Sequence, residues 1–456
     1  MEPLRIGLTI HGKCKSLSYE GKGVVAYGDD VFYVEGMFPG DEGELCIIYK
    51  RGGEFFGEIK KLDAISPNRI QPRCKICRAC GGCCFQQLSY PAQLEWKRDF
   101  VISQLRHFGI DGIEVLPTIG MDDPYHYRNK IQVPFAKDRK GKVYYGFYKT
   151  GTHVIVPTDI CHIEDKRAHH ILNEISKLLE SFHIDPYQED SRYGVLRHVL
   201  IRTSFYKPQI MVVLVTNVDV FPSRNNFVKA LIKRCPEITT VVQNINPRQT
   251  NVILGERERV LYGKGFIEDS LCGVEFKISA KSFYQTNPVM TEKLYKTAMD
   301  FANLTKNDIV FDAYSGIGTI GLIASKNVKE VISVELVKEA VRDAVNNAKV
   351  NNVTNFLAYC DDATKFMVNM AREHRPVDVL FMDPPRKGSD DKFIEATFRL
   401  KPKRVVYISC NPSTLARDLK KLSERYRIEK LQPFDMFPHT SHVETVAMLS
   451  LRESKK

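Results

Sequence analysis

Two polar segments that each follow a short apolar run carry residue types suited to covalent chemistry. Residues 377–382 and 405–408 are rich in β-branched and aliphatic side chains, and a helical pattern at 391–400 separates them. Asp383-Pro384-Pro385-Arg386 follows the first run, and Ser409-Cys410-Asn411-Pro412 follows the second. In a strand–helix–strand unit the strands are parallel, and their carboxyl ends meet at the sheet edge where α/β folds bind ligands. We therefore expect a carboxylate and a thiol to converge on one site.

Cys410 has a plain structural interpretation and a chemical one. A cysteine next to a strand is most often a small core residue. Cys410, however, lies beyond the apolar run, between polar neighbours and opposite the Asp-Pro-Pro-Arg segment. This position favours a nucleophile, because a thiolate can add to an electron-poor carbon and form a covalent intermediate.

Length and composition limit the class of protein. The chain has 456 residues and a net charge of +11, which predicts several domains and suits a polyanionic partner such as RNA, although a basic enzyme would look the same. It begins with no secretory signal and contains no run of 18 apolar residues, so we expect no membrane partner and a cytoplasmic location. In such a chain the 12 cysteines do not indicate a disulfide framework.

The first part of the chain, residues 1–66, has the pattern of a small β-barrel. Short β-like runs at 23–26, 30–36, 43–49 and 54–62 alternate with turns rich in glycine and aspartate. Such closely spaced short strands predict a barrel of the oligonucleotide-binding kind.

A dense group of cysteines follows. Four of them recur every third residue and a fifth is adjacent: Cys74, Cys77, Cys80, Cys83 and Cys84. This spacing gathers thiolates around a metal centre, and both zinc and an iron–sulfur cluster are compatible with it. A radical-enzyme loop would need a cysteine at position 87, where the chain has Gln87.

The middle region, residues 92–280, mixes strand and helix patterns. Its segment 127–149 is basic and contains several aromatic residues: Tyr127, Phe135, Tyr144, Tyr145, Phe147 and Tyr148. Positive charge with aromatic rings suits looped or single-stranded RNA, on whose bases the rings stack. An ordinary hairpin with a solvated face is the alternative.

From residue 282 onward, strand and helix patterns alternate, which predicts a doubly wound α/β fold. The loop Gly316-Ile317-Gly318-Thr319-Ile320-Gly321 fits G-x-G-x-x-G, with Glu335 after the next strand. That pattern fits a dinucleotide site or an S-adenosylmethionine site. Asp312, Asp362 and the Asp-Pro-Pro segment favour the methyl donor, because hydride transfer needs no acid at each successive strand end.

Five motifs together carry a resemblance to a known family. They are SFYQTN at 282–287, DAYSGIGTIG at 312–321, DPPRKG at 383–388, SCNP at 409–412 and HVETV at 442–446. Over essentially its whole length the chain resembles the RNA (uracil-5-)-methyltransferases, in particular the 23S rRNA enzymes of the RumA/RlmCD type. The resemblance implies a TRAM barrel at 1–66, an iron–sulfur loop with a mixed α+β RNA-binding domain at 67–281, and a Rossmann-like methyltransferase domain at 282–456.

The same resemblance implies roles for individual residues. Cys410 is the nucleophile and Glu444 the general base, while His439 and His442 are alternative bases for which we expect a core or surface role. Phe283 stacks on the extruded uracil. The residues expected to contact S-adenosylmethionine are Gln285, Tyr314, Glu335 and Asp383, with Thr319 and Asp362 as further contacts. The ligands expected for a [4Fe–4S] cluster are Cys74, Cys80, Cys83 and Cys161, with Cys77 and Cys84 as extra cysteines.

The expected substrate is 23S rRNA, because the tRNA branch of the family is expected to lack both barrel and cluster. Alternatives are a tRNA (uracil-5-)-methyltransferase and a cytosine-5 RNA methyltransferase, although Ser409 stands where the latter usually has proline. A non-catalytic iron–sulfur protein that binds RNA is the alternative from another class. We expect a monomer.

Overall fold

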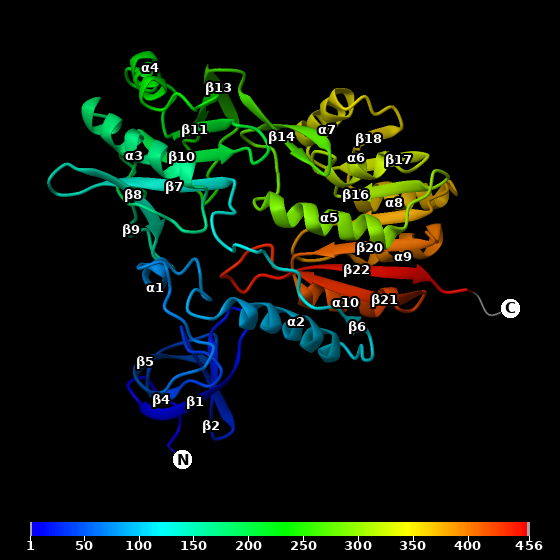
Figure 1. Ribbon diagram of the computed structural model, residues 1–456, viewed down its shortest axis with the longest axis horizontal. Helices are drawn as coiled ribbons and strands as arrows, with labels where there is room; N and C mark the ends of the chain where they lie inside the picture. The colour runs from blue at the N-terminus through cyan, green and yellow to red at the C-terminus, as the bar shows by residue number, and fades with distance from the viewer. Residues whose placement is uncertain (1, 454–456) are drawn as a thin grey trace.

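Three large β-structures follow one another along the chain in the computed structural model, which describes residues 2–453. Figure 1 shows the N-terminal barrel in blue, the middle sheet in cyan and green, and the C-terminal sheet in yellow to red. The predicted fold class, a doubly wound α/β domain with a small barrel and a mixed middle region, is confirmed. No helix within these described residues is long and apolar enough to cross a membrane.

The barrel closes in the order β1-β2-β3-β5-β4. Its strands are β1 (Thr9–Leu17), β2 (Gly23–Tyr27), β3 (Asp30–Val34), β4 (Glu42–Arg51) and β5 (Glu54–Ala64). Alternate side chains fill the interior, and Asp41, which is fully buried, fastens the exit of the barrel. Its carboxylate accepts hydrogen bonds from the backbone N–H groups of Phe38 (2.7 Å) and Ser66 (2.8 Å) and from the Arg69 guanidinium.

The segment after the barrel leads first to the C-terminal sheet and only then to the middle one. A short helix, α1 (Cys77–Cys80), precedes α2 (Tyr90–His107) and β6 (Glu114–Val115). Strand β6 pairs with β21 (Tyr426–Phe434), and α2 buries apolar side chains in the core below it. These elements of the 67–281 segment pack against the C-terminal sheet, so the two sheets do not divide the chain simply at 281/282. The domain boundary expected there stays a prediction.

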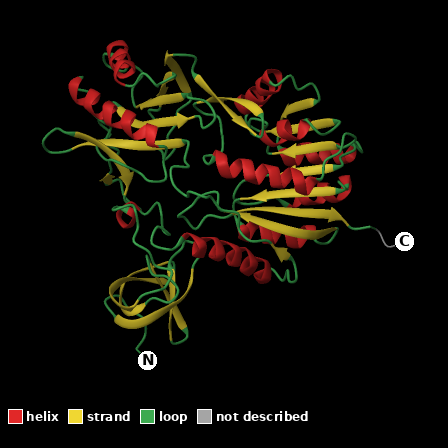
Figure 2. Cartoon of the chain, viewed as in Figure 1, coloured by secondary structure: helices red, strands yellow, loops and turns green. Residues whose placement is uncertain are grey.

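The middle sheet has seven strands in the order β13-β12-β11-β10-β7-β8-β9. Helices α3 (Lys166–Ser181) and α4 (Arg224–Arg234) lie against one face of it, as Figure 2 shows, and bury an aliphatic core there. The strands are β7 (Lys130–Lys137), β8 (Val143–Tyr148), β9 (Ile155–Pro157), β10 (Leu196–Thr203), β11 (Ile210–Thr216), β12 (Thr240–Ile245) and β13 (Arg257–Tyr262).

The C-terminal sheet runs β18-β17-β16-β19-β20-β22-β21-β6, and its first five strands are parallel. Those strands are β16 (Ile309–Ala313), β17 (Glu330–Glu335), β18 (Phe356–Cys360), β19 (Val379–Met382) and β20 (Arg404–Ser409). The helices are α5 (Pro288–Ala302), α6 (Thr319–Ser325), α7 (Lys338–Val350), α8 (Ala363–Arg372), α9 (Asp391–Leu400) and α10 (Pro412–Leu422). Because strand order reverses beside β16, a crevice opens at the carboxyl ends of the strands.

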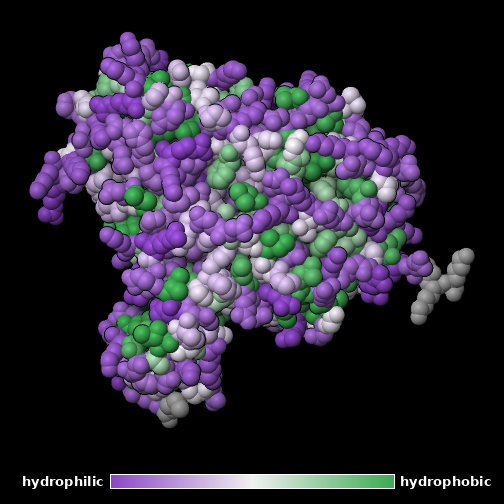
Figure 3. All heavy atoms as spheres, in the orientation of Figure 1, coloured by the Kyte–Doolittle hydropathy of each residue, from purple (hydrophilic) through white to green (hydrophobic). Residues whose placement is uncertain are grey.

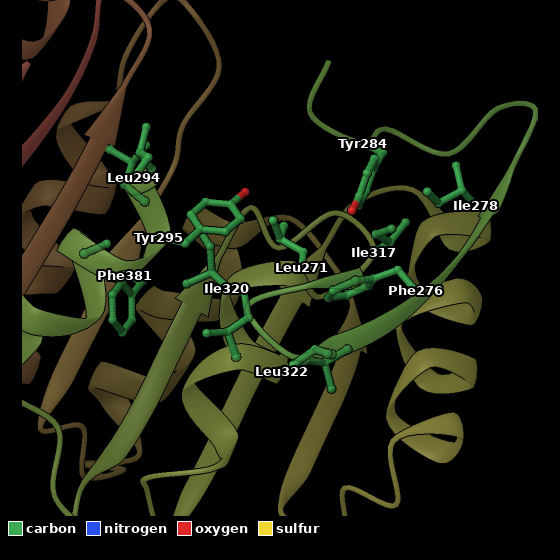
Figure 4. Packing of buried hydrophobic residues seen from close by; sticks show 14 of the residues in the cluster. Leu271, Phe276, Ile278, Tyr284, Leu294, Tyr295, Ile317, Ile320, Leu322 and Phe381 are labelled. Carbon is green, nitrogen blue, oxygen red and sulfur yellow. The ribbon is translucent and has the colours of Figure 1, made fainter. Parts of the chain in front are cut away.

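A hairpin of β14 (Phe266–Leu271) and β15 (Val274–Ser279) packs beneath the glycine loop. In Figure 4, Phe276 and Ile278 of this hairpin lie near Ile317 of the loop, and Leu271 of the hairpin lies between Ile317 and Ile320. The loop is therefore held from below by buried apolar contacts. Figure 3 shows that hydrophilic residues cover most of the viewed face, with apolar residues scattered among them.

Candidate active site

A cavity of about 840 Å³ lies at the carboxyl ends of β16, β17, β19 and β20. Its size suits a cofactor together with part of a larger substrate. The cavity gathers most of the residues singled out in the sequence: Phe283, Gln285, Tyr314, Glu335, Asp362, Asp383, Cys410 and Glu444. The prediction that strand ends bring the thiol and the carboxylate together is therefore confirmed as geometry.

Cys410 and Glu444 lie at the adjoining ends of two antiparallel strands. Ser409 of β20 pairs with Thr445 of β22 (Glu444–Leu451) as the last pair of this ladder, so Cys410 directly follows one partner and Glu444 directly precedes the other. Both side chains line the cavity. This register carries the acid from the end of the chain to the thiol.

The acids beside the thiol have raised pKa values. Burial raises the pKa of Asp383 to about 7 and raises that of Glu444 well above its ordinary value, with Asp383 adding to the second shift. Burial also raises the pKa of Cys410 to about 11, with help from Glu444 and Asp383 and against the opposing charge of Arg386. Perturbed groups of this kind in a cavity are typical of general acid–base and nucleophilic chemistry.

The two polar strand ends are tied to each other by side chains of α10. Asn411 caps this helix by accepting from the Ser413 backbone N–H at 3.1 Å. The carbonyl of Arg386 accepts hydrogen bonds from the Asn411 amide (3.2 Å) and the Thr414 hydroxyl (3.3 Å). The Asp-Pro-Pro-Arg turn and Cys410 therefore keep a fixed relation.

The glycine loop presents backbone to the cavity. Tyr314 and Gly316 have φ of 63° and 56°, and a Cβ at Gly316 would meet no atom within 4 Å, so the chain is open there to a close ligand. The Glu335 carboxylate accepts from the N–H groups of Gly316 (3.0 Å) and Val337 (2.9 Å). An open glycine loop with an acid at the next strand end fits the ribose and amino-acid parts of a nucleoside donor.

Two residues of the same region have other surroundings. Asp312 is fully buried beneath the loop, where it accepts from the Gly321 N–H at 2.9 Å and where burial raises its pKa to about 8. The hydroxyl of Thr319 lies 3.3 Å from that of Tyr295, and its expected donor contact stays a prediction. Asp362 both lines the cavity and caps α8 through the Lys365 N–H at 2.9 Å.

Comparisons with known proteins agree with this geometry. Residues 89–452 match the sequence model of the tRNA (Uracil-5-)-methyltransferase family. The chain belongs to this family. It is 39% identical over 444 residues to an uncharacterized RNA methyltransferase of Staphylococcus aureus, covering 97% of this chain and 98% of the relative. An uncharacterized RNA methyltransferase of Listeria monocytogenes is 40% identical over 438 residues, covering 96% of each chain.

A solved structure indicates which methyl donor the family uses. The tRNA (uracil-54, C5)-methyltransferase of Pyrococcus abyssi in complex with S-adenosyl-L-homocysteine has a TM-score of 0.78 and 27% identity, and the match covers 96% of this chain and 100% of that one. The protein is therefore an RNA methyltransferase that uses S-adenosylmethionine. The match covers 96% of this chain, so it includes the barrel. The barrel therefore does not separate rRNA enzymes from tRNA enzymes, and the expectation that the tRNA branch lacks a barrel was wrong.

The two histidines near Glu444 differ in their surroundings. His439 is 2% exposed, its ring nitrogen lies 3.3 Å from the Gln93 amide, and burial lowers its pKa to about 4. This is the core role expected for it. His442 lines the cavity, and burial followed by the charge of Arg386 lowers its pKa.

Several cavity residues of the methyltransferase had no role in the sequence prediction. Gly82 and Arg128 line the cavity from the cysteine segment and from the chain just before β7, and Phe437 lines it from the segment before β22. A fully buried ion pair of Lys97 with Asp435 fastens that last segment to α2. No local sequence pattern predicts these contacts, because the residues that meet are far apart along the chain.

Cysteines of the loop before α2, together with Cys161, form a separate pocket. Its cavity is small, about 20 Å³, and is lined by Cys74, Cys77, Cys80, Cys83 and Cys161. Cys161 comes from the loop before α3, so the pocket joins the early loop to the middle sheet. The thiol of Cys84 lies instead beside Gly21 and Ser441, outside this group.

The aromatic residues of segment 127–149 divide into two sets. Tyr127, Phe135 and Tyr145 are between 1% and 3% exposed and belong to the protein interior. They cannot stack on a base, so for them the ordinary hairpin interpretation holds. Tyr144, Phe147 and Tyr148 are only partly buried.

Proposed function

We propose that the protein methylates C5 of uridine in RNA through a covalent adduct between Cys410 and the uracil ring. The observation that carries the proposal is the pairing of β20 with β22, which brings the strand ends that carry Cys410 and Glu444 together in the cavity of the glycine loop. A thiol and a carboxyl on opposite strands suit the first and last steps of one reaction.

The chemistry follows from the weakness of uracil C5 as a nucleophile. The Cys410 thiolate adds to C6, and the electron pair of the C5–C6 bond moves toward O4 as an enolate, which makes C5 nucleophilic. S-adenosylmethionine, when bound, would supply the methyl group that C5 takes up, and its sulfur would leave as the thioether of S-adenosylhomocysteine. Glu444 then removes the proton from C5, the C6–S bond breaks, and Cys410 leaves as a thiolate.

The remaining cavity residues hold the two substrates. We assign the methyl donor to Gln285, Tyr314, Glu335 and Asp383, with Asp362 and Thr319 as further contacts. Phe283 is 70% exposed at the cavity, which suits stacking on a uracil that has left its RNA stack. Such extrusion is required, because neither face of a stacked base is open to the thiol.

We further propose that Cys74, Cys80, Cys83 and Cys161 bind a [4Fe–4S] cluster. The shared pocket supports this, since its thiols come from two separated segments. Among the described residues, the group whose potential metal-binding atoms all lie within 4.8 Å of one another is His170, Cys235 and Glu237, and none of these three belongs to the pocket.

The proposed target is 23S rRNA, recognised by a TRAM-like barrel at 1–66 and by the middle region at 67–281, with methyl transfer in the domain at 282–456. A tRNA target is the second candidate, favoured by the likeness to the Pyrococcus abyssi tRNA enzyme. Ribosomal and transfer RNA from cells that lack the gene should be incubated separately with the enzyme and donor. Mass spectrometry of the digested RNA should then find 5-methyluridine in 23S rRNA, and its appearance only in tRNA would reverse the assignment.

Two assays separate a uracil-5 enzyme from a cytosine-5 enzyme and from a non-catalytic RNA-binding protein. Replacing the target uridine by cytidine in a transcript should abolish methyl transfer, whereas a cytosine-5 enzyme would gain activity. A non-catalytic RNA-binding protein would bind radiolabelled donor without passing the label to any RNA.

A further inference from the structure

A second cavity, of about 510 Å³, lies on the middle sheet and takes no part in the reaction proposed above. Side chains of β7, β8 and β10 form its floor, and the segments 187–192 and 249–253 form its walls. Gln132 and Pro134 of β7 line it, while Ile131 and Val133 belong to the core beneath α3. Since side chains alternate along a strand, the cavity is on the face of the sheet opposite that core.

An irregularity in β10 directs two polar side chains into this cavity. The pairing of β10 with β11 shifts register between Leu196 and His198, as at a β-bulge. Consecutive residues at a bulge need not alternate between faces, and both Arg197 and His198 line the cavity. Bulges often re-aim side chains in this way at binding sites.

Arg197 is only 3% exposed, and hydrogen bonds hold its guanidinium in place. Its guanidinium donates to the carbonyls of Asn246 (3.0 Å) and Arg248 (2.6 Å) and to both carboxylate oxygens of Glu189 (2.8 and 3.1 Å). It also lies over the ring of Tyr187, 4.9 Å from the centroid. A charge-assisted network of this kind keeps the cavity in one shape without any ligand.

His198 offers an unused hydrogen-bonding atom. It is 7% exposed, and its Nδ1 has no hydrogen-bond partner among the described residues. Burial lowers the pKa of its imidazole to about 4, so at neutral pH the ring carries one N–H and one free nitrogen. Buried polar atoms are rarely left without a partner, so the chain itself leaves the hydrogen bonding of this ring incomplete.

Partly buried aromatic side chains complete the cavity. Tyr148 lies 6.4 Å from His198 and 5.8 Å from His153, measured between ring centroids. Flat rings beside amide, imidazole and guanidinium groups are what proteins use to hold an unstacked nucleobase.

The cavity is also close to the proposed reaction centre. Arg128 lines the catalytic cavity and Gln132 lines this one, four residues further along the chain. Extended backbone advances about 3.3 Å per residue, so these two positions are at most about 13 Å apart at Cα. A few nucleotides of single-stranded RNA bridge that distance.

We propose that the second cavity binds the base of an unpaired nucleotide of the RNA substrate, close in sequence to the uridine that is methylated. Tyr148 stacks on that base, while His198 and the network around Arg197 face its edge. The inference rests on the proposed function only in taking RNA as the substrate.

The test compares three variants on the RNA that the wild-type enzyme methylates. Tyr148→Ala should raise the RNA Kd and the KM for RNA about tenfold, because base–aromatic stacking typically contributes this much. Tyr148→Phe should restore both values, since it keeps the ring. Tyr262→Ala, which removes an exposed tyrosine from β13 of the same sheet, should change neither. The Kd for S-adenosylmethionine and the melting temperature, unchanged in all three, verify that each variant is folded.

A direct measurement identifies the contact. After ultraviolet irradiation of the wild-type complex, mass spectrometry should find a nucleotide attached to the peptide that contains Phe147 and Tyr148. Wild-type affinity of Tyr148→Ala, or attachment only to peptides of the catalytic cavity, would overturn the second site while leaving the methylation proposal intact. If the wild-type enzyme methylates no RNA, it is the proposed function that fails.

Discussion

Cysteine side chains lie in two different environments, one at the carboxyl ends of the C-terminal strands, here called the catalytic edge, and one in the cysteine pocket. Cys410 lines a cavity of about 840 Å³ together with Asp383, Glu444 and the positive charge of Arg386. The pocket cysteines enclose about 20 Å³ among mainly apolar neighbours. A nucleophile needs space for its substrate and groups that move protons, whereas metal ligands need close enclosure. Cysteine type and spacing alone do not make this distinction.

The largest effect expected is at the nucleophile. Cys410→Ala should reduce methyl transfer by about 10⁴-fold or more and abolish any covalent RNA adduct, because it removes the thiol proposed to add to C6. The matched control is Cys360→Ala, at the end of β18 on the same sheet, where the thiol is exposed. Transfer of tritiated methyl groups to RNA measures the first effect and a denaturing gel the second. An adduct band from Cys410→Ala would show that the roles are assigned wrongly.

Loss of the base should stop the same reaction at a later step. Glu444→Gln should lower turnover by about 10²–10⁴-fold, since that is what a general base contributes. Addition and methyl transfer continue, so the enzyme should accumulate as a heat-stable, donor-dependent complex with methylated RNA. A wild-type turnover rate would rule out this role for Glu444.

Substitution of a pocket cysteine should lower the metal content of the protein. Anaerobically purified protein should be brown with about four irons per chain, and Cys83→Ser should lose most of them. Cys84→Ser should keep them, because that thiol lies beside Gly21 and Ser441. Iron analysis and visible absorption measure both, and a colourless wild-type protein with one zinc would remove the cluster from the proposal.

Buried acid at the glycine loop should make stability depend on pH. Burial raises the pKa of Asp312 from 3.8 to about 8, so between these values the folded state holds a proton that the unfolded state has lost. Stability therefore falls as pH rises through this window. Asp312→Asn should remove that slope and stabilise the protein at pH 8 by at least about 1 kcal/mol, the equivalent of one pKa unit. Thermal melts at pH 5 and pH 8 measure the difference, and parallel pH profiles would contradict it.

The smallest effect concerns the contact between the barrel and the catalytic edge. The Arg386 guanidinium donates to the hydroxyl of Tyr19, in the loop between β1 and β2, and Arg386 opposes the rise in the pKa of Cys410. Tyr19→Phe keeps the ring but frees the guanidinium, so kcat/KM should fall about threefold, the effect of losing one modest hydrogen bond. The pH–rate profile should move to higher pH as well. A loss of rate without that movement would mean that Tyr19 acts only in docking the barrel.

Local patterns were sufficient for much of the catalytic edge. The apolar runs before Asp383 and Ser409 predicted parallel strands, and parallel strands bring their ends together whatever the loops contain. The glycine loop and Glu335 were equally local, since a turn and the next strand end fix their relation. The barrel followed from short strands and turns in the same way.

Predictions that needed long-range packing were less complete. Tyr127 and Phe135 have the same types as stacking residues, yet burial put them in the interior, and only the folded sheet shows which face each residue occupies. Strand β6 joins the sheet of β21 across more than 300 residues, a pairing that no local pattern signals.

By itself the sequence determined the class of fold, the residues that could do chemistry and the strand ends that carry most of them. These properties depend on periodicity and turn chemistry, which act over a few residues. The tertiary structure alone decided that Glu444 shares a cavity with Cys410, that Cys77 lines the cysteine pocket while Cys84 lies outside it, and that a second cavity opens beside β7. Each of these depends on strand register or on the packing of distant segments, which are properties of the whole folded chain.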